Sequence, residues 1–251
     1  MTMKRYTMIC VLLSLLGGIM APGAIAADKK GAQLYADLLS AYVHDGVVDY
    51  QGFAADEGKL DAYLDFLASL DPGKMPRNEK FAFYINAYNA WTIKLILTKY
   101  PDLTSIKDLG SFFSSPWKKK ICRINGRMLS LDEIEHDILR PEFQDPRVHF
   151  AINCASKSCP KLISEPYEAD ILDSQLDAVT KEFINNPERN YLSGTTLYVS
   201  KIFKWFKEDF TNGVLAFFLA HASGELKRSL LANADTITIK YLDYDWSLNN
   251  E

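Results

Sequence analysis

The chain has 251 residues, of which 48% are hydrophobic and 12% aromatic, and its formal net charge is −4. This composition supplies enough apolar side chains for a sizeable core and excludes a largely disordered protein. The negative charge argues against a nucleic-acid or anionic-membrane partner, because both attract basic surfaces.

The first 26 residues have the three zones of a secretory signal peptide. Lys4 and Arg5 precede an apolar run, Met8–Met20, which is followed by the small residues Ala24-Ile25-Ala26. The run is shorter than the roughly 20 residues that a membrane-spanning helix needs, so we expect cleavage after Ala26 and no retained anchor. Residues 27–251 are then expected to form one soluble domain that is periplasmic or secreted.

Several stretches repeat apolar residues at helical spacing. The sequence predicts helices over residues 31–43, 60–67, 78–99, 130–139 and 168–184, and two more within 212–231. Asn125-Gly126 and Ser193-Gly194 separate apolar segments and predict two β-hairpins, and residues 148–152 and 236–241 are predicted as further strands. The expected fold class is therefore α+β, a helix-rich single domain with a small, mainly antiparallel sheet.

Cleavage of the signal peptide would remove Cys10 and leave Cys122, Cys154 and Cys159. An odd number of cysteines in an oxidising compartment leaves at least one thiol without a partner in the chain. Cys154 lies just beyond the strand predicted over residues 148–152, where the chain turns to small and polar residues, at a position where nucleophiles commonly lie. This makes Cys154 the first candidate for a reactive residue.

A nearby base or cation would favour the reactive thiolate form of Cys154. His149 and His136 are the candidate bases, although the alternation of side chains along a strand places His149 and Cys154 on opposite faces. Two alternatives stay open. One is a structural disulfide between Cys154 and Cys159, and the other is an inert buried thiol.

Glu133 and His136 lie one turn apart on a predicted helix, which is one half of a di-metal carboxylate site. The sequence contains no second copy of this motif, and Glu133 also follows Ser130 by three residues, the spacing of a capping box. His136 is thus a candidate base or metal ligand, and the alternative is that Glu133 simply caps the helix. Apart from this metal hypothesis, the sequence indicates no cofactor.

Asn86 and Asn89 lie three residues apart in the apolar helix predicted over residues 78–99. Amides are costly in a buried helix unless they are hydrogen-bonded, so each needs a partner. One hypothesis is that an Asn orients the histidine of a Cys-His pair, as in papain-like sites. The alternative is that both amides tie loops to the core helix.

Five segments stand in this order along the chain: FAFYINAYNAWTIKLIL, PWKKKICRINGRMLSLDEIEHDILRP, RVHFAINCASKSCPKL, LYVSKIFKWFKEDF and YLDYDWSLN. Together they resemble the family catalogued as domain of unknown function 547, which has no established activity. The resemblance implies that family members usually have a cysteine at the position of Cys154 and sometimes a serine at the position of Cys159. A disulfide would then not be the shared purpose of Cys154, which favours a functional thiol. A helix with paired Asn and a later His/Cys segment is also loosely similar to papain- or transglutaminase-like enzymes, by analogy.

The leading functional hypothesis is an exported, cysteine-dependent acyl-transfer enzyme that hydrolyses or transfers an amide or ester. Cys154 would be the nucleophile, His149 or His136 the base, and Asn86 or Asn89 the residue that orients the base. The rival hypothesis is a non-enzymatic binding module with structural cysteines. Its partner would be a small molecule, a peptide or a component of the cell envelope.

Overall fold

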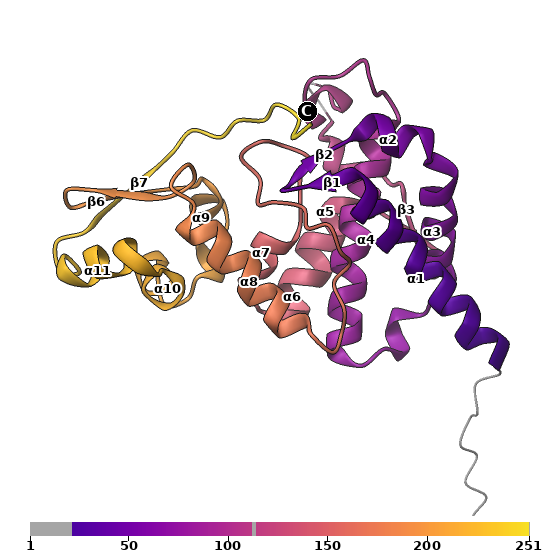
Figure 1. Cartoon of the computed structure of the whole chain (residues 1–251), viewed down its shortest axis with the longest axis horizontal. Helices are drawn as coiled ribbons and strands as arrows, with labels where there is room; N and C mark the ends of the chain where they lie inside the picture. Colours follow the sequence, from indigo (N-terminus) through magenta and orange to yellow (C-terminus); the bar gives the residue numbers. More distant parts are fainter. Residues whose placement is uncertain (1–21, 112–113, 251) are drawn as a thin grey trace, which may run out of the picture.

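A computed structural model of the protein describes residues 22–111 and 114–250. It confirms the helix-rich α+β class (Figure 1). The helices are α1 (Pro22–Tyr42), α2 (Tyr50–Ala55), α3 (Glu57–Ser69), α4 (Arg77–Leu97), α5 (Leu131–Glu133), α6 (Arg140–Phe143), α7 (Val148–Ala151), α8 (Leu172–Asn185), α9 (Ile202–Trp205), α10 (Val214–His221) and α11 (Gly224–Ala232). The strands are β1 (Val43–His44), β2 (Val47–Val48), β3 (Cys122–Ile124), β4 (Arg127–Leu129), β5 (Tyr191–Ser193), β6 (Thr196–Val199) and β7 (Thr238–Tyr241).

Most of the predicted signal peptide, residues 1–21, lies outside the described residues. Helix α1 begins at Pro22, so the predicted cleavage position after Ala26 falls within this helix. Cleavage and export therefore stay predictions. In the described part of the chain, no helix combines the length and apolar character that crossing a membrane requires.

The strands form three small sheets, and both predicted hairpins are confirmed. β3 pairs with β4 across Asn125-Gly126, and β5 pairs with β6 across Ser193-Gly194, both antiparallel. β7 joins β6 in parallel, because α9, α10 and α11 provide the long crossover that parallel strands need. The largest sheet is therefore mixed, while the β1–β2 and β3–β4 pairs are antiparallel.

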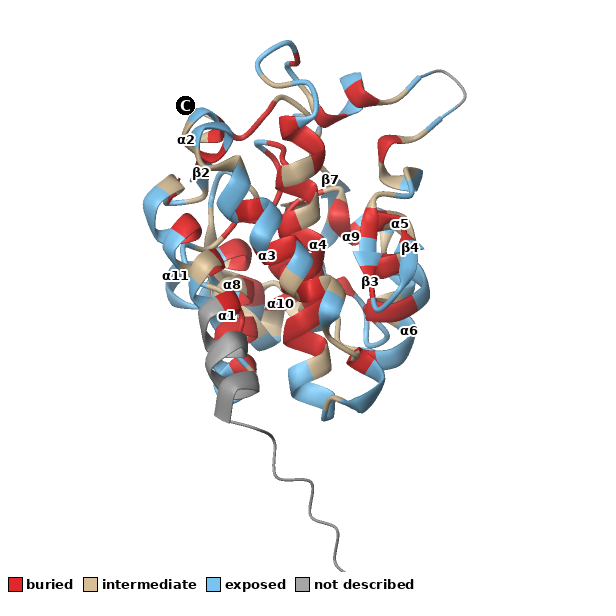
Figure 2. Ribbon diagram, turned by 90° about the vertical axis from the view of Figure 1, so that its right-hand side faces the viewer, coloured by how far each residue is buried: buried red, intermediate tan, exposed pale blue. Residues whose placement is uncertain are grey.

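Two hydrophobic cores hold these elements together. In the first core, α1, α3 and α4 pack with the β3–β4 hairpin, and α4 is buried along most of its length (Figure 2). The Tyr35 and Tyr63 rings stack with centroids 4.4 Å apart and join α1 to α3. In the second core, an aromatic cluster that includes Phe183, Phe203 and Phe218 joins α8 and α9 to α10. These apolar contacts supply most of the stabilising free energy.

Residues 148–152, predicted as a strand, instead form the short helix α7 between the two cores, so this prediction was wrong. Val148 and Ala151 pack in the first core, whereas Phe150 packs in the second. A short apolar segment that is buried on all sides has no polar face, so its periodicity cannot distinguish a helical turn from a strand.

The helix predicted over residues 130–139 continues past Pro141 and ends at Phe143, which corrects its predicted end. Between α5 and α6 the chain forms a π-helical segment, η4 (Ile134–Leu139). Pro141 lies in the first turn of α6, where a proline without an N–H group is tolerated. The π-helical turn therefore allows the proline to stand inside a continuous helical stretch.

Asn89 of α4 fastens the end of α7 to the first core. Its Nδ2 donates a hydrogen bond to the Ala151 carbonyl at 3.0 Å, and its Oδ1 accepts one from the Asn153 N–H at 2.8 Å. All three residues are buried, so these groups have no access to water. The Asn89 amide thus holds the backbone from which the Cys154 loop begins.

Replacement of Asn89 by Ala should lower the free energy of unfolding by about 2 to 4 kcal/mol. The physical reason is that the Ala151 carbonyl and the Asn153 N–H would stay buried without partners. Urea denaturation followed by tryptophan fluorescence measures the change. The control is Gln33→Ala, which removes an exposed amide bonded only to Asp37 and should cost less than about 0.5 kcal/mol. Equal losses of unfolding free energy in the two variants would contradict the role of Asn89 in holding the end of α7.

Candidate functional site

Cys154 lies in a cleft of about 240 Å³ between the two cores. The cleft has aromatic walls and a group of ionisable side chains. The aromatic lining residues are Tyr88, Trp117, Trp205, Phe206 and Trp246, and the ionisable ones are Asp132, Glu135, His136, His149, Cys154 and Cys159. Three of the predicted site residues, Cys154, His149 and His136, are therefore brought together at one surface.

The two cysteines stand at the ends of a tight loop. Their Sγ atoms are 2.8 Å apart, and both are free thiols. The Cys154 N–H donates to the Cys159 sulfur at 2.9 Å, and Ala155 adopts a left-handed conformation with φ of 58°. Asn153 braces the loop by accepting from the Ala155 N–H and donating to the Pro160 carbonyl. The loop thus brings the two sulfurs close together, and the disulfide between them stays a prediction.

The surroundings of the two sulfurs differ. Cys154 is partly exposed, whereas Cys159 is buried. Burial raises the pKa of Cys154, but hydrogen bonds with Cys159, Ser156 and Tyr244 outweigh this effect and lower the pKa to about 7. Burial and the neighbouring Cys154 sulfur raise the pKa of Cys159 well above its usual value. Cys154 therefore loses its proton first and becomes the accessible thiolate.

Glu135 is a buried carboxyl that the sequence analysis passed over. Burial raises its pKa to about 7, and the negative charge of Cys154 acts in the same direction, while a hydrogen bond from the Tyr88 hydroxyl at 3.1 Å opposes the rise. The sequence contains an indication of this residue. Glu135 stands four residues after Leu131 and three before Ile138, so helical spacing places it on the same face as these apolar residues. A carboxyl at this position of an apolar helix face is buried, and a buried carboxyl near neutral pKa can transfer protons.

His149 is buried against Phe206, with the two ring centroids 4.0 Å apart. Its Nε2 lies 2.6 Å from an oxygen of Asp209, and its Nδ1 has no hydrogen-bond partner among the described residues. Burial lowers the pKa of His149, and the Asp209 carboxylate only partly offsets this effect. The ring is therefore neutral at pH 7, with its proton on Nε2 and a free electron pair on Nδ1.

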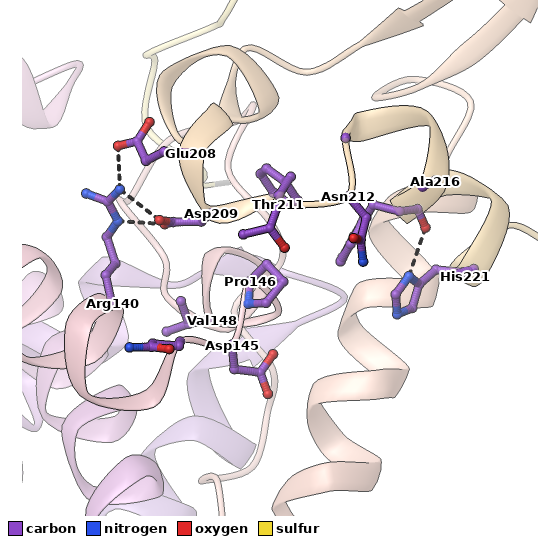
Figure 3. A pocket seen from close by; sticks show the side chains of 15 residues that line it. Arg140, Asp145, Pro146, Val148, Glu208, Asp209, Thr211, Asn212, Ala216 and His221 are labelled. Atoms are coloured by element: carbon purple, nitrogen blue, oxygen red, sulfur yellow. Dashed lines mark hydrogen bonds and ion pairs between the residues drawn. The ribbon is translucent and has the colours of Figure 1, made fainter.

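Arg140 connects the two histidines. Its Nη1 lies 2.7 Å from His136 Nδ1, and its Nε donates to the Asp209 carboxylate at 2.6 Å. Figure 3 shows Arg140 reaching Asp209 and Glu208 at the wall of a second cavity of about 630 Å³, which lies next to the cleft. No hydrogen bond among the described residues joins Cys154 to either histidine. The histidines are thus neighbours of the thiol and not its direct partners.

The remaining predicted site residues are Asn86, Asn89 and Glu133, and each forms hydrogen bonds to the backbone. Asn86 exchanges two hydrogen bonds with the backbone of Tyr167, at 2.8 and 2.9 Å, and both polar groups of the Asn89 amide are occupied in the same way. Glu133 completes a capping box with Ser130 and pairs with Lys120. These contacts support the alternatives in which the amides tie loops to the core helix and Glu133 caps the next one.

Within residues 22–111 and 114–250, no group of three His, Cys, Asp or Glu side chains could hold a metal ion. His136 has Asp132 and Arg140 as neighbours, and Glu133 lies in the capping box rather than on the cleft wall. The described structure therefore gives the metal hypothesis for Glu133 and His136 no supporting geometry.

Tyr244 and Trp246, which no sequence pattern had indicated as site residues, reach the site from the C-terminal segment. After β7 this segment runs back from the second core toward β1 and β2 (Figure 1). The Ser158 and Lys157 N–H groups donate to its carbonyls, and the segment therefore borders the cysteine loop. This approach depends on the tertiary fold, so no local sequence pattern could reveal it.

Fold and cleft together define an α+β protein with a dithiol in an aromatic cleft. Residues 72–184 match the family model described as Protein of unknown function, DUF547, and this match supports membership of that family. The matched segment contains Tyr88, Glu135, His149 and both cysteines of the loop. The chain has no match among curated proteins and none among solved structures, so the likeness to papain-like enzymes stays an analogy.

The raised pKa of Glu135 predicts a loss of stability with rising pH. The native protein holds a proton that the unfolded chain releases, so this stabilising contribution is complete below about pH 4.5 and is lost as pH rises to about 7. The Glu135→Gln variant is neutral throughout this range. Between pH 5 and pH 8 it should lose less unfolding free energy than the native chain, by up to about 3 kcal/mol.

Urea denaturation at both pH values measures this difference. Other groups that titrate in the same range, such as His149, are present in both proteins and cancel in the comparison. A Glu79→Gln variant, which changes an exposed carboxyl, is the matched control and should follow the native chain. The same pH dependence in Glu135→Gln and the native chain would show that Glu135 is ionised in the folded protein.

Proposed function

We propose that this protein is a thiol enzyme in which Cys154 is the reactive group and Cys159 the resolving thiol, and that its reaction is thiol–disulfide exchange. One observation carries this proposal. The two Sγ atoms lie 2.8 Å apart at a cleft, with Cys154 partly exposed and Cys159 buried behind it. This is the arrangement that exchange requires, because one sulfur must meet the substrate and the other must then attack the first.

The reaction has two steps. The Cys154 thiolate attacks one sulfur of a substrate disulfide, the substrate S–S bond breaks, and one substrate thiolate leaves and takes up a proton. Cys159 then loses its proton and attacks the Cys154 sulfur, which releases the second substrate thiol and forms a Cys154–Cys159 disulfide. Counted from the protonated dithiol, so that the proton lost when Cys154 ionises is included, the cysteine pair loses two electrons and two protons and the substrate gains them. An external dithiol would return the pair to its reduced form.

Glu135 is suited to the proton transfers of this reaction. Its pKa of about 7 lets it exist in both forms near neutral pH, and its carboxyl interacts with the Cys154 charge. The leaving thiolate needs a proton and the resolving thiol must give one up. A buried carboxyl can serve both steps, because each transfer returns it to the form that the other requires.

Acyl transfer at Cys154 is the second candidate, and a specific observation favours it. His149 lines the same cleft and is backed by Asp209, and its buried Nδ1, which has no hydrogen-bond partner among the described residues, could accept a proton if a bound substrate opened a path to it. Exposure of the protein to p-nitrophenyl acetate should then give an acylated Cys154. His149→Gln should slow this acylation about 100-fold and leave disulfide exchange unchanged. Acylation that is absent or insensitive to this substitution would reject the second candidate.

The exchange reaction is tested with reduced protein and a disulfide-linked dimer of a short peptide. We expect release of two peptide thiols and a protein that is two hydrogens lighter, with the bond mapped to Cys154 and Cys159. Cys154→Ser should be inactive. Cys159→Ser should accumulate a mixed disulfide between Cys154 and one peptide, because the second attack is lost. Cys122→Ser is the matched control, since Cys122 is buried in the first core and should not affect the reaction.

The lowered pKa of Cys154 gives a second readout. Its rate of alkylation by iodoacetamide should rise with pH around a midpoint near 7, well below the value of 9.0 for an unperturbed thiol. Mass mapping after partial alkylation separates this site from Cys122 and Cys159. A midpoint near 9, or a stable mixed disulfide in the native chain that Cys159 does not resolve, would overturn the proposed reaction.

A further inference from the structure

Four aromatic residues beside the cleft form what we call the tryptophan cluster: Trp117, Trp205, Tyr244 and Trp246. The Trp246 ring lies 5.6 Å from the rings of Trp117 and Trp205 and 4.6 Å from that of Tyr244, measured between centroids. Trp205 is 41% exposed, although it belongs to a helix whose neighbouring Ile202 and Phe203 are buried. An exposed tryptophan that continues into partly exposed rings at a cleft commonly marks a surface that recognises a ligand.

This cluster is continuous with the reactive sulfur. The Tyr244 hydroxyl lies 3.3 Å from Cys154 Sγ, and the ring of Trp205 packs on Tyr244 with centroids 4.8 Å apart. Any molecule whose sulfur reaches Cys154 therefore places its adjacent groups against these rings. The rings come from three separate parts of the chain, and Trp246 and Tyr244 are held by the segment that borders the cysteine loop.

The charge of the cleft restricts the substrate further. Asp132 and Glu135 line it, and none of its described lining residues is Lys or Arg. The ammonium of Lys107 lies 3.9 Å from the centroid of the Trp246 ring but is not on the cleft wall. Lys107 is close enough for its charge to interact with Cys154, but on the described cleft wall itself a small anionic disulfide would meet the carboxylate of Asp132 and no lysine or arginine.

The volume of the cleft also argues against a small disulfide as the substrate. Its volume of about 240 Å³ is below the ~300–1,000 Å³ that encloses a whole small-molecule ligand. One cystine sulfur and an adjacent apolar side chain would fill it, while the rest of the substrate stays outside. This is how a polypeptide presents a disulfide.

We infer that the substrate is a polypeptide disulfide with an apolar or aromatic residue next to the reacting cysteine, held against the tryptophan cluster. This inference rests on the proposed exchange reaction and names its substrate class. Recognition by aromatic rings is tolerant of sequence, so a range of such polypeptides would react.

Three disulfides test the inference: a peptide dimer with Phe beside the cysteine, the same dimer with Asp in that position, and oxidised glutathione. Each rate constant is divided by the rate of the same disulfide with dithiothreitol, which removes differences in intrinsic reactivity. We expect the Phe dimer to react at least about tenfold faster than the other two. Trp205→Ala should reduce this preference to about threefold or less, and the rate of each protein is divided by its own rate of Cys154 alkylation by iodoacetamide, so that a change in the thiol itself is removed from the comparison.

Leu231→Ala is the matched control, because it also removes an exposed apolar side chain, but on α11. It should keep the full preference. Equal normalised rates for the three disulfides, or a preference that Trp205→Ala does not reduce, would overturn the inference while the exchange reaction stands. If no disulfide reacts although iodoacetamide still alkylates Cys154, the proposed reaction itself fails, and this inference fails with it.

Discussion

The site depends on one buried contact, the pair of hydrogen bonds through which Asn89 holds the end of α7. Helix α4 is enclosed in the first core and cannot move without disturbing it, so its amide is a fixed reference point. The residues just before the cysteine loop are tied to that point. Because α7 also contributes Phe150 to the second core, the loop starts from a backbone that both cores fix. A dithiol whose sulfurs must meet within a few ångströms needs this rigidity.

Differential burial then assigns the two cysteines their roles. Both sulfurs share one loop and border the same cleft, yet Cys159 is buried and Cys154 is partly exposed. Burial penalises a thiolate, and hydrogen bonds of the Cys154 sulfur with Cys159, Ser156 and Tyr244 offset this penalty. The same burial keeps Glu135 close to neutral. One environment therefore favours a thiolate, a protected thiol and a proton-carrying carboxyl, and in the described part of the chain the hydrogen-bond partners of the Cys154 sulfur are all uncharged groups.

The sequence indicated those parts of the site that depend on local patterns. Cys154 was recognisable because small and polar residues follow an apolar segment, and the capping box of Ser130 and Glu133 follows from spacing alone. The conformation of residues 148–152 was not predictable, since burial between two cores removes the periodicity that separates helix from strand. Tyr244 and Asp209 reach the site from distant parts of the chain, and only tertiary packing decides that approach. Glu135 could have been recognised as a carboxyl on an apolar helix face. The neighbouring Glu133 and His136 were interpreted as a possible metal motif instead.

The position of His149 bears on the choice between the two chemistries. In a Cys-His enzyme the imidazolium beside the sulfur favours the thiolate, so thiol and imidazole form an ion pair. Here hydrogen-bond donors that carry no net charge lower the pKa of Cys154, and burial lowers that of His149, which keeps the ring neutral. The thiolate therefore forms without help from His149. A neutral imidazole held by Asp209 and stacked on Phe206 supports the cleft wall, and acyl transfer would require a bound substrate to bring that ring and the sulfur into one proton path. Disulfide exchange needs no such rearrangement, because its second sulfur is already in place.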